Sequence, residues 1–139
     1  MDAPRPIAPG LFTDDGAAPR LVATRCAACA RLQFPASDTC PYCGHDVTHP
    51  AAVGGTGTLY LYTTVSTAPP GYRGPLPFGF GVVELPEGLR VITRLTETDL
   101  AALRPGLPMR LDVAPLYTDD DGTPVLSYAY APDHPGGRP

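Results

Sequence analysis

Beyond residue 55 the chain alternates between apolar and polar residues in short runs, which is the pattern of half-buried β-strands. Loops rich in Pro, Gly and Asp separate the runs. Five strands are predicted, at residues 58–66, 78–85, 89–95, 109–113 and 125–130. Between the third and fourth strands, residues 98–103 combine a Thr cap with good helix formers and predict one short helix. This layout is typical of an OB-fold, a five-stranded Greek-key barrel, although other five-stranded barrels share it.

The alternation also predicts which side chains fill the barrel. Side chains two positions apart lie on the same face of a strand. On the first strand, Leu59, Leu61 and Val65 are expected on one face, with Tyr60, Tyr62 and Thr64 on the other. On the third strand, Leu89, Val91 and Leu95 are expected to point inward. The same alternation turns Arg90 and Arg94 outward on the third strand.

The remaining segments lack a regular pattern. Residues 1–20 mix Pro, Gly and Asp with few apolar residues, which predicts an extended arm whose docking residues are Leu11 and Phe12. A spacer of small residues before position 56 separates all four cysteines from the alternating region. The expected units are an N-terminal arm at 1–20, a cysteine module at 21–52, an OB-fold at 53–132 and a flexible tail at 133–139.

Composition narrows the choice of function. With 19 Pro and 15 Gly, about a quarter of the 139 residues disfavour long helices, so an all-helical fold is disfavoured. The chain has ten Arg, no Lys and 14 acidic residues, so its formal charge is -4 and a nucleic-acid partner is not favoured. It has no apolar run of about 18 residues and no signal-peptide pattern at its start, so we expect a cytoplasmic protein without a membrane segment.

Two CxxC pairs form the strongest motif. Cys26 and Cys29 make the first pair, and Cys40 and Cys43 make the second pair after ten intervening residues. Each CxxC turn aims both thiols at one point. Two such turns together place four thiolates at the corners of a tetrahedron, which Zn²⁺ accepts at about 2.3 Å from each sulfur. Four thiolates and one Zn²⁺ lower the formal charge to about -6, so the metal creates no cationic surface.

Three interpretations of the cysteines compete: structural zinc, a redox dithiol and disulfides. Disulfides suit secreted chains, and a thioredoxin-type CxxC opens a helix in a βαβ unit that this sequence lacks. A structural zinc in a rubredoxin-like ribbon is therefore favoured, with iron at the same site as the alternative. Gly44 suits the turn after the last cysteine, whereas Ala30 departs from that pattern. His45 and His49 are expected to be ordinary surface residues.

The sequence shows no catalytic constellation. The four cysteines are assigned to the metal, lysine is absent, and no serine lies in a nucleophile-elbow motif. There is no Walker loop and no GxGxxG motif, and Gly79 and Gly81 lie within a predicted strand, where they favour bending. Four cysteines also leave no open position for a catalytic zinc. We therefore predict that the chain alone is not an enzyme, although it can be a subunit of one.

Several motifs occur in a fixed order and support a comparison with a family. After the CxxC pairs come GTLYLYT at 57–63, VELPEGLR at 83–90 and PGLPM at 105–109. In this order the motifs resemble the acyl-CoA-associated zinc-ribbon OB-fold proteins, over about residues 19–130. The chain departs from the family pattern at its N-terminus, where a Pro-rich arm stands in place of a longer helical segment.

The resemblance implies a companion role. Members of this family are generally small partners of thiolase-like proteins, including lipid-transfer-type thiolases and aldolases that cleave CoA-linked steroid side chains. This implies a hetero-oligomer in which the chain stabilises its partner and helps to form an acyl-CoA channel, while the partner supplies the chemistry. Two alternatives are a single-stranded nucleic-acid-binding module and a freestanding acyl-CoA carrier.

Contact residues are expected at three places. The longest irregular stretch, residues 67–77, leads to Phe78, and we expect Tyr72, Arg73 and Phe78 to touch the ligand or the partner, although a rigid barrel connection competes. The residues expected to cover a partner interface are Leu11, Phe12, Tyr72 and Phe78. Arg90 and Arg94 are candidates for a CoA phosphate, but an ion pair with Glu84 across the hairpin is favoured.

Overall fold

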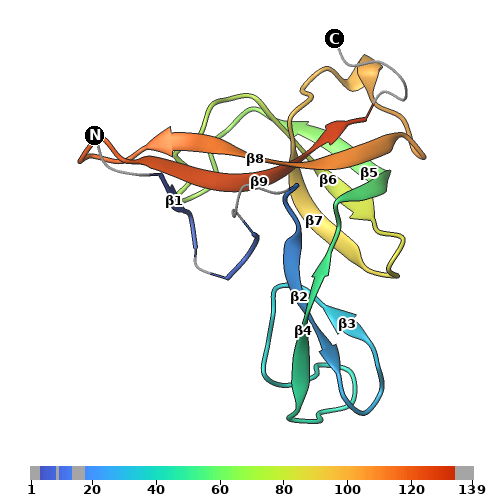
Figure 1. Ribbon diagram of the computed structural model, residues 1–139. Coiled ribbons are helices and arrows are strands. Elements are labelled where there is room, and N and C mark those ends of the chain that lie inside the picture. Colours follow the sequence, from blue (N-terminus) through green and yellow to red (C-terminus); the bar gives the residue numbers. More distant parts are fainter. Residues whose placement is uncertain (1–3, 9, 14–17, 134–139) are drawn as a thin grey trace.

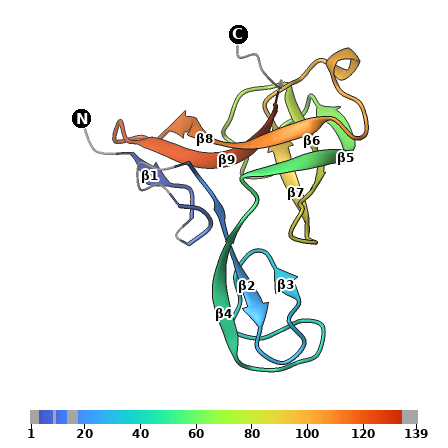
Figure 2. The same ribbon diagram turned by 45° about the vertical axis from the view of Figure 1, so that its right-hand side comes forward.

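The computed structural model describes residues 4–8, 10–13 and 18–133 and shows a barrel with a smaller sheet attached to one end (Figure 1). Both views place the small sheet as a projection from the barrel (Figure 2). Within the described residues, no helix has the length and apolar character needed to cross a membrane. Apart from Asp133, the predicted tail lies outside the described residues.

Five strands form the barrel, and the predicted mainly-β OB-fold class is confirmed. Neighbouring strands pair in the order β9-β7-β6-β5-β8, and a further β8–β9 pairing closes the barrel. All of these pairs are antiparallel except β7–β9, which is parallel. The strands are β5 (Thr56–Val65), β6 (Phe78–Glu84), β7 (Arg90–Leu95), β8 (Pro108–Thr118) and β9 (Pro124–Pro132).

The predicted helix between the third and fourth strands is shorter than expected. A single 3₁₀ turn, η1 (Leu100–Ala102), replaces the helix predicted at 98–103. Its cap is Asp99 rather than Thr98, since the Asp99 carboxylate accepts a hydrogen bond from the Ala101 N–H at 3.0 Å. Leu103 is already extended, so the helix ends after one turn.

A β-bulge in β5 overturns part of the predicted facing pattern. Leu59 pairs with Val83 and Leu61 pairs with Val82, which leaves one extra residue, Tyr60, on β5. A bulge shifts the alternation by one residue. Leu59 and Leu61 therefore do not share a face as expected: Leu59 is buried, Leu61 is 57% exposed, and Tyr62 packs against the core.

The cysteine module forms a three-stranded antiparallel sheet in the order β3-β2-β4. Its strands are β2 (Leu21–Cys26), β3 (Leu32–Gln33) and β4 (Thr48–Val53). Leu21 and Val53 are fully or almost fully buried, in the same core cluster as the barrel residues. Tyr130 of β9 donates its hydroxyl proton to the Gly54 carbonyl at 2.6 Å, and so fixes the linker between the two sheets. The expected division at residues 52 and 53 stays a prediction.

The N-terminal arm has more structure than its sequence predicts. Strand β1 (Arg5–Pro6) pairs with β9 in parallel, and the Ile7 N–H donates to the Leu126 carbonyl at 2.7 Å. Further on, Phe12 forms a bridge with Leu21 and is only 9% exposed. Phe12, with Leu11 packed beside it, thus adds to the core of this chain, whereas Ile7 stays exposed.

Candidate metal centre and contact surfaces

Two tight turns bring the four cysteines together. In the first turn the Ala30 N–H donates to the Cys26 carbonyl at 3.0 Å, and in the second the Gly44 N–H donates to the Cys40 carbonyl at 2.9 Å. Both turns end in the left-handed region, with φ of 65° at Ala30 and 78° at Gly44. Glycine adopts this conformation freely, whereas alanine does so at a cost of about 1–2 kcal/mol. The departure noted in the sequence therefore keeps the same backbone shape.

The four sulfur atoms have the spacing of a tetrahedral metal site. All four lie within 4.8 Å of one another, and the Cys26–Cys43 and Cys29–Cys40 Sγ distances are both 3.6 Å. A zinc tetrahedron with bonds of about 2.3 Å has sulfur–sulfur edges of about 3.8 Å. The thiols therefore fit one structural Zn²⁺, which would cross-link the two turns and take no part in catalysis.

Backbone N–H groups prepare the sulfurs for a metal. The Cys29 and Ala28 N–H groups donate to Cys26 Sγ at 3.4 Å and 3.3 Å, and the Tyr42 N–H donates to Cys40 Sγ at 3.4 Å. The hydrogen bond from Cys29 first, and then that from Ala28, lower the pKa of the Cys26 thiol to about 6 against the opposing effect of burial. His45 and His49 are exposed and lie outside the cysteine cluster, as expected.

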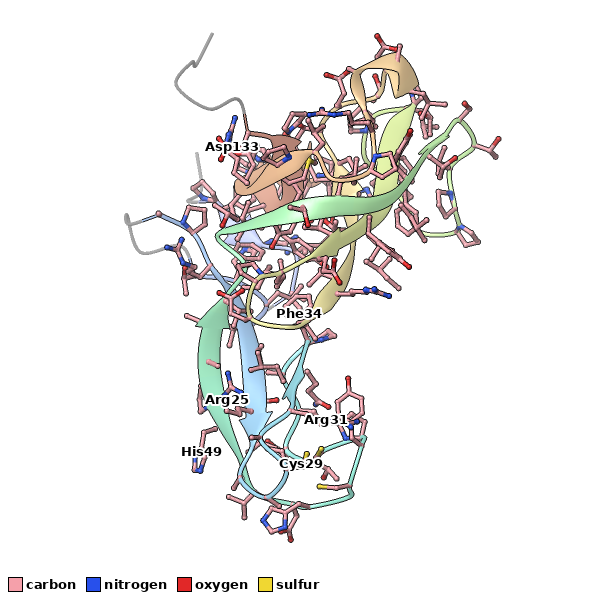
Figure 3. All side chains as sticks on the ribbon, turned by 90° about the vertical axis from the view of Figure 1, so that its right-hand side faces the viewer. Arg25, Cys29, Arg31, Phe34, His49 and Asp133 are labelled. Atoms are coloured by element: carbon pink, nitrogen blue, oxygen red, sulfur yellow. The ribbon has the colours of Figure 1, made fainter. Side chains whose placement is uncertain are left out.

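The main cleft lies between the cysteine module and the β6–β7 hairpin. Phe34 lies at this junction and Cys29 at the far end of the module, with Arg31 between them (Figure 3). The cleft has a volume of about 690 Å³. Its charged and aromatic lining consists of Arg25, Arg31, Tyr42, Glu84, Glu87 and Arg90. Sequence reasoning missed Arg25, Arg31 and Tyr42, although their places beside the two CxxC pairs were a usable signal.

Arg90 forms the expected ion pair across the hairpin. Its Nε donates to Glu84 at 3.3 Å, and the two residues lie opposite each other on β7 and β6. Its guanidinium also lies 4.0 Å from the centroid of the Tyr60 ring. Arg94 has no such pair: burial lowers its pKa, and its Nε is buried without a hydrogen-bond partner among the described residues.

The loop before β6 is held against the β8–β9 hairpin. Arg73 donates to Asp119 at 3.2 Å and to Asp120 at 3.3 Å, and Arg5 from the arm also reaches Asp119. Hydrogen bonds from the Asp120 backbone and then from Arg73 lower the pKa of Asp119. The side chain of Arg73 is thus engaged within the chain, as a rigid barrel connection requires. Contact of Arg73 with a ligand or partner stays a prediction.

Two of the expected partner contacts are buried within this chain. Phe78 is 6% exposed, with its ring 4.7 Å from that of Tyr72, and Phe12 packs against Tyr128 with ring centroids 6.4 Å apart. Neither ring presents much surface to another protein, because both fill the core. Tyr72 and Leu11 are half-buried and keep some accessible surface. The apolar periodicity of a sequence alone cannot distinguish a residue that fills the core from one that contacts a partner.

The outer face of the barrel shows an apolar row that the sequence analysis did not identify. Leu61 pairs with Val82, and Val82 pairs with Ile92, so the three side chains cross β5, β6 and β7 in one line. Leu61 and Ile92 are 57% and 65% exposed. The bulge in β5 that turns Leu61 outward completes this row, and an isolated alternating sequence does not reveal a bulge.

The fold and the cysteine site together define a zinc-ribbon OB-fold protein. The family model of the ChsH2 rubredoxin-like zinc ribbon domain matches residues 13–48, and that of the ChsH2 C-terminal OB-fold domain matches residues 51–114. The benzoylsuccinyl-CoA thiolase subunit BbsA of Thauera aromatica is 31% identical over 116 residues, covering 84% of this chain and 78% of the relative. The chain belongs to the ChsH2 zinc-ribbon and OB-fold family.

Two further similarities are to a protein named as an enzyme subunit and to a chain of a solved aldolase structure. A probable enoyl-CoA hydratase alpha subunit of Thermomonospora curvata is 38% identical over 93 residues, but the match covers 67% of this chain and only 29% of that protein. A solved structure, the Ltp2-ChsH2(DUF35) aldolase, contains a similar chain with a TM-score of 0.63 and 31% identity, covering 81% of this chain and 84% of that one. The family expected from the motifs is thus confirmed.

Proposed function

We propose that this chain is a non-catalytic companion subunit of a thiolase-like or aldolase enzyme that acts on acyl-CoA thioesters. The observation that carries the proposal is the match over both sheets to a thiolase subunit and to a chain of an aldolase complex, each 31% identical. The resemblance described above adds CoA thioesters of steroid side chains as one substrate class. The proposed partner supplies the catalytic residues, and the assembly is a hetero-oligomer.

The composition of the chain supports a companion role. Its four cysteines fit a closed metal site, which offers no coordination position to a substrate. The chain contains no lysine, and its exposed apolar row crosses three strands of the barrel. A contiguous apolar surface on a small domain is typical of a protein interface. These features fit a subunit that acts through its partner.

The main cleft supports a direct contact with the thioester. Arg31 lies over the Tyr42 ring, with the guanidinium carbon 5.0 Å from the ring centroid, and Arg25 donates to the Ala30 carbonyl at 2.7 Å. Each contact orients a guanidinium and leaves other N–H donors available. Planar guanidinium groups suit phosphate oxygens, and the volume of about 690 Å³ lies in the usual range for small-molecule sites. We assign this cleft to the phosphorylated end of the thioester.

An activity assay on the assembled enzyme tests this function. The thiolase-like partner from the same host is purified with and without this chain, and acyl-CoA turnover is measured. We expect no turnover by the chain alone and at least a tenfold higher rate for the complex than for the partner. Arg31→Glu should raise the KM for the thioester about tenfold, because a charge-assisted hydrogen bond is replaced by repulsion. Arg104→Glu, in an exposed loop near η1, is the matched control.

Three outcomes would contradict the proposal. A partner that is equally soluble and active without the chain removes the companion role. Salt-dependent binding of the isolated chain to single-stranded oligonucleotides favours the nucleic-acid module instead. Acyl-CoA binding by the isolated chain, with no partner in any assembly, points to the freestanding carrier.

A further inference from the structure

A second hollow lies at the junction between the zinc ribbon and the barrel, and its lining comes from segments far apart in the sequence. Its volume is about 390 Å³. Arg20 enters it just before β2, and Gly55 and Thr56 enter from the linker and the start of β5. Glu87 from the β6–β7 loop and Arg110 from β8 complete the polar lining. Two arginines therefore share one small hollow with a single acid.

Arg110 has unmet hydrogen-bonding capacity. It lies on β8 opposite Thr56 of β5 and Ala131 of β9, within the barrel wall. Its Nε is buried and has no hydrogen-bond partner among the described residues. A buried donor without an acceptor is unfavourable, and such donors in native proteins usually meet a water, an ion or a ligand. The side chain of Arg110 lines this hollow, and no partner of its guanidinium is found among the described residues, so its outer N–H donors are available to an acceptor there.

Arg20 bonds to its own backbone neighbour and lies close to the linker at Gly55. Its Nη1 donates to the Pro19 carbonyl at 2.9 Å, which uses one of its five N–H donors. A Cβ atom at position 55 would lie 2.5 Å from Nη1 and 2.7 Å from Cζ of Arg20. Gly55 thus permits the guanidinium to lie directly on the linker, and any larger residue there would displace it. The guanidinium of Arg20 thus lies beside Gly55 at the junction.

The charges in the hollow do not neutralise each other. The ion pairs found among the described residues join Arg5, Arg73 and Arg90 to acids elsewhere. Arg20, Arg110 and Glu87 take part in none of them, so the hollow keeps a net positive charge in a chain of formal charge -4. Two guanidinium groups facing one small volume repel each other until an anion enters.

We propose that this hollow binds a phosphate group, held by the guanidinium groups of Arg20 and Arg110 and the hydroxyl of Thr56. A tetrahedral anion presents oxygens in several directions and can accept from two guanidinium groups at once, whereas one such group satisfies a carboxylate. The hollow is larger than a lone phosphate needs and leaves room for an organic remainder. Because Arg20 leads into the ribbon and Arg110 belongs to the barrel, the bound group joins the two sheets. The inference stands apart from the companion role.

Thermal unfolding of the zinc-loaded full chain tests this site. Inorganic phosphate and glycerol 3-phosphate are the probes, compared with acetate and chloride at equal ionic strength. We expect a saturable rise of the unfolding midpoint with phosphate, by about 4 °C at ten times Kd, and none with the two controls. Arg110→Gln should weaken binding at least tenfold, and Glu87→Gln should strengthen it. Arg104→Gln, on an exposed loop, should leave it unchanged.

The other results of this experiment also support or overturn the phosphate site. If Arg110→Gln fails to fold, Arg20→Gln replaces it, since Arg20 is exposed and its loss leaves the barrel wall intact. A larger rise of the unfolding midpoint with glycerol 3-phosphate than with inorganic phosphate identifies the ligand as an organic phosphate. Equal rises with the two probes identify it as the free ion. Equal shifts with acetate overturn the proposal. So does a Glu87→Gln variant that destabilises the ion-free chain and abolishes the effect of Arg110→Gln, since Glu87 is then the partner of Arg110.

Discussion

The Cys40→Ser variant is expected to lose its zinc and the fold of residues 21–53. Cys40 is 4% exposed, and its Sγ lies 3.6 Å from the Sγ of Cys29, so its thiolate is central to the cluster. In small zinc domains the metal supplies an apparent folding free energy of about 10–16 kcal/mol at pH 7. Metal analysis should therefore fall from about one zinc per chain to none. The amide NMR signals of β2, β3 and β4 should collapse to unfolded positions.

A matched control separates the loss of metal from a general effect of substitution. His45→Ala changes an exposed residue two positions after the last cysteine and keeps the backbone carbonyl that accepts a hydrogen bond from Cys40 N–H at 2.9 Å. It should retain the zinc and the ribbon signals. A Cys40→Ser chain that stays fully folded without metal would show that the cysteines are not a structural zinc site.

Gly81→Ala is expected to destabilise the barrel by about 3 kcal/mol, because overpacking against a fixed backbone has no room to relax. A Cβ atom at position 81 would lie 2.2 Å from the Leu61 carbonyl oxygen and 3.1 Å from the Tyr62 Cα. Both atoms belong to the backbone of β5, directly after the bulge, where Tyr62 pairs with Gly81 of β6. Urea unfolding of the zinc-loaded chain measures the loss as a lower midpoint at an unchanged slope.

Gly122→Ala provides the comparison for this effect. Gly122 has φ of 86°, which disfavours alanine, but a Cβ atom there meets nothing within 4 Å. Gly122→Ala should lower the free energy of unfolding by the cost of the left-handed conformation alone, about 1–2 kcal/mol. If Gly81→Ala is no more destabilising than Gly122→Ala, β5 and β6 do not approach as closely as the structure shows.

The strands could be predicted because burial on one face leaves a period of two in the sequence. The irregular positions could not, because each depends on a partner strand. The bulge at Tyr60 adds one residue to β5 without disturbing the run of β-forming residues. Strand β8 was predicted to end at Val113 but continues to Thr118, because Pro115 is accommodated where the pairing with β9 shifts register.

The metal site was predictable, and the contact surfaces were not. Two CxxC pairs carry their geometry in their local spacing, so four thiols could be placed from sequence alone. Whether an aromatic side chain fills the core or faces a partner depends on long-range packing. Phe12 is buried by Leu21 and Tyr128, and Phe78 lies against Tyr72. The ion pairs of Asp119 join residues more than forty positions apart and leave no local pattern.

The companion role is tested most directly by capturing the tagged chain from its native host and identifying the bound proteins by mass spectrometry, with zinc analysis of the same sample. The account predicts a thiolase-like or aldolase protein in stoichiometric amount, together with about one zinc per chain. Recovery of nucleic acid, or of the zinc-loaded chain alone under conditions that preserve other complexes, would contradict it.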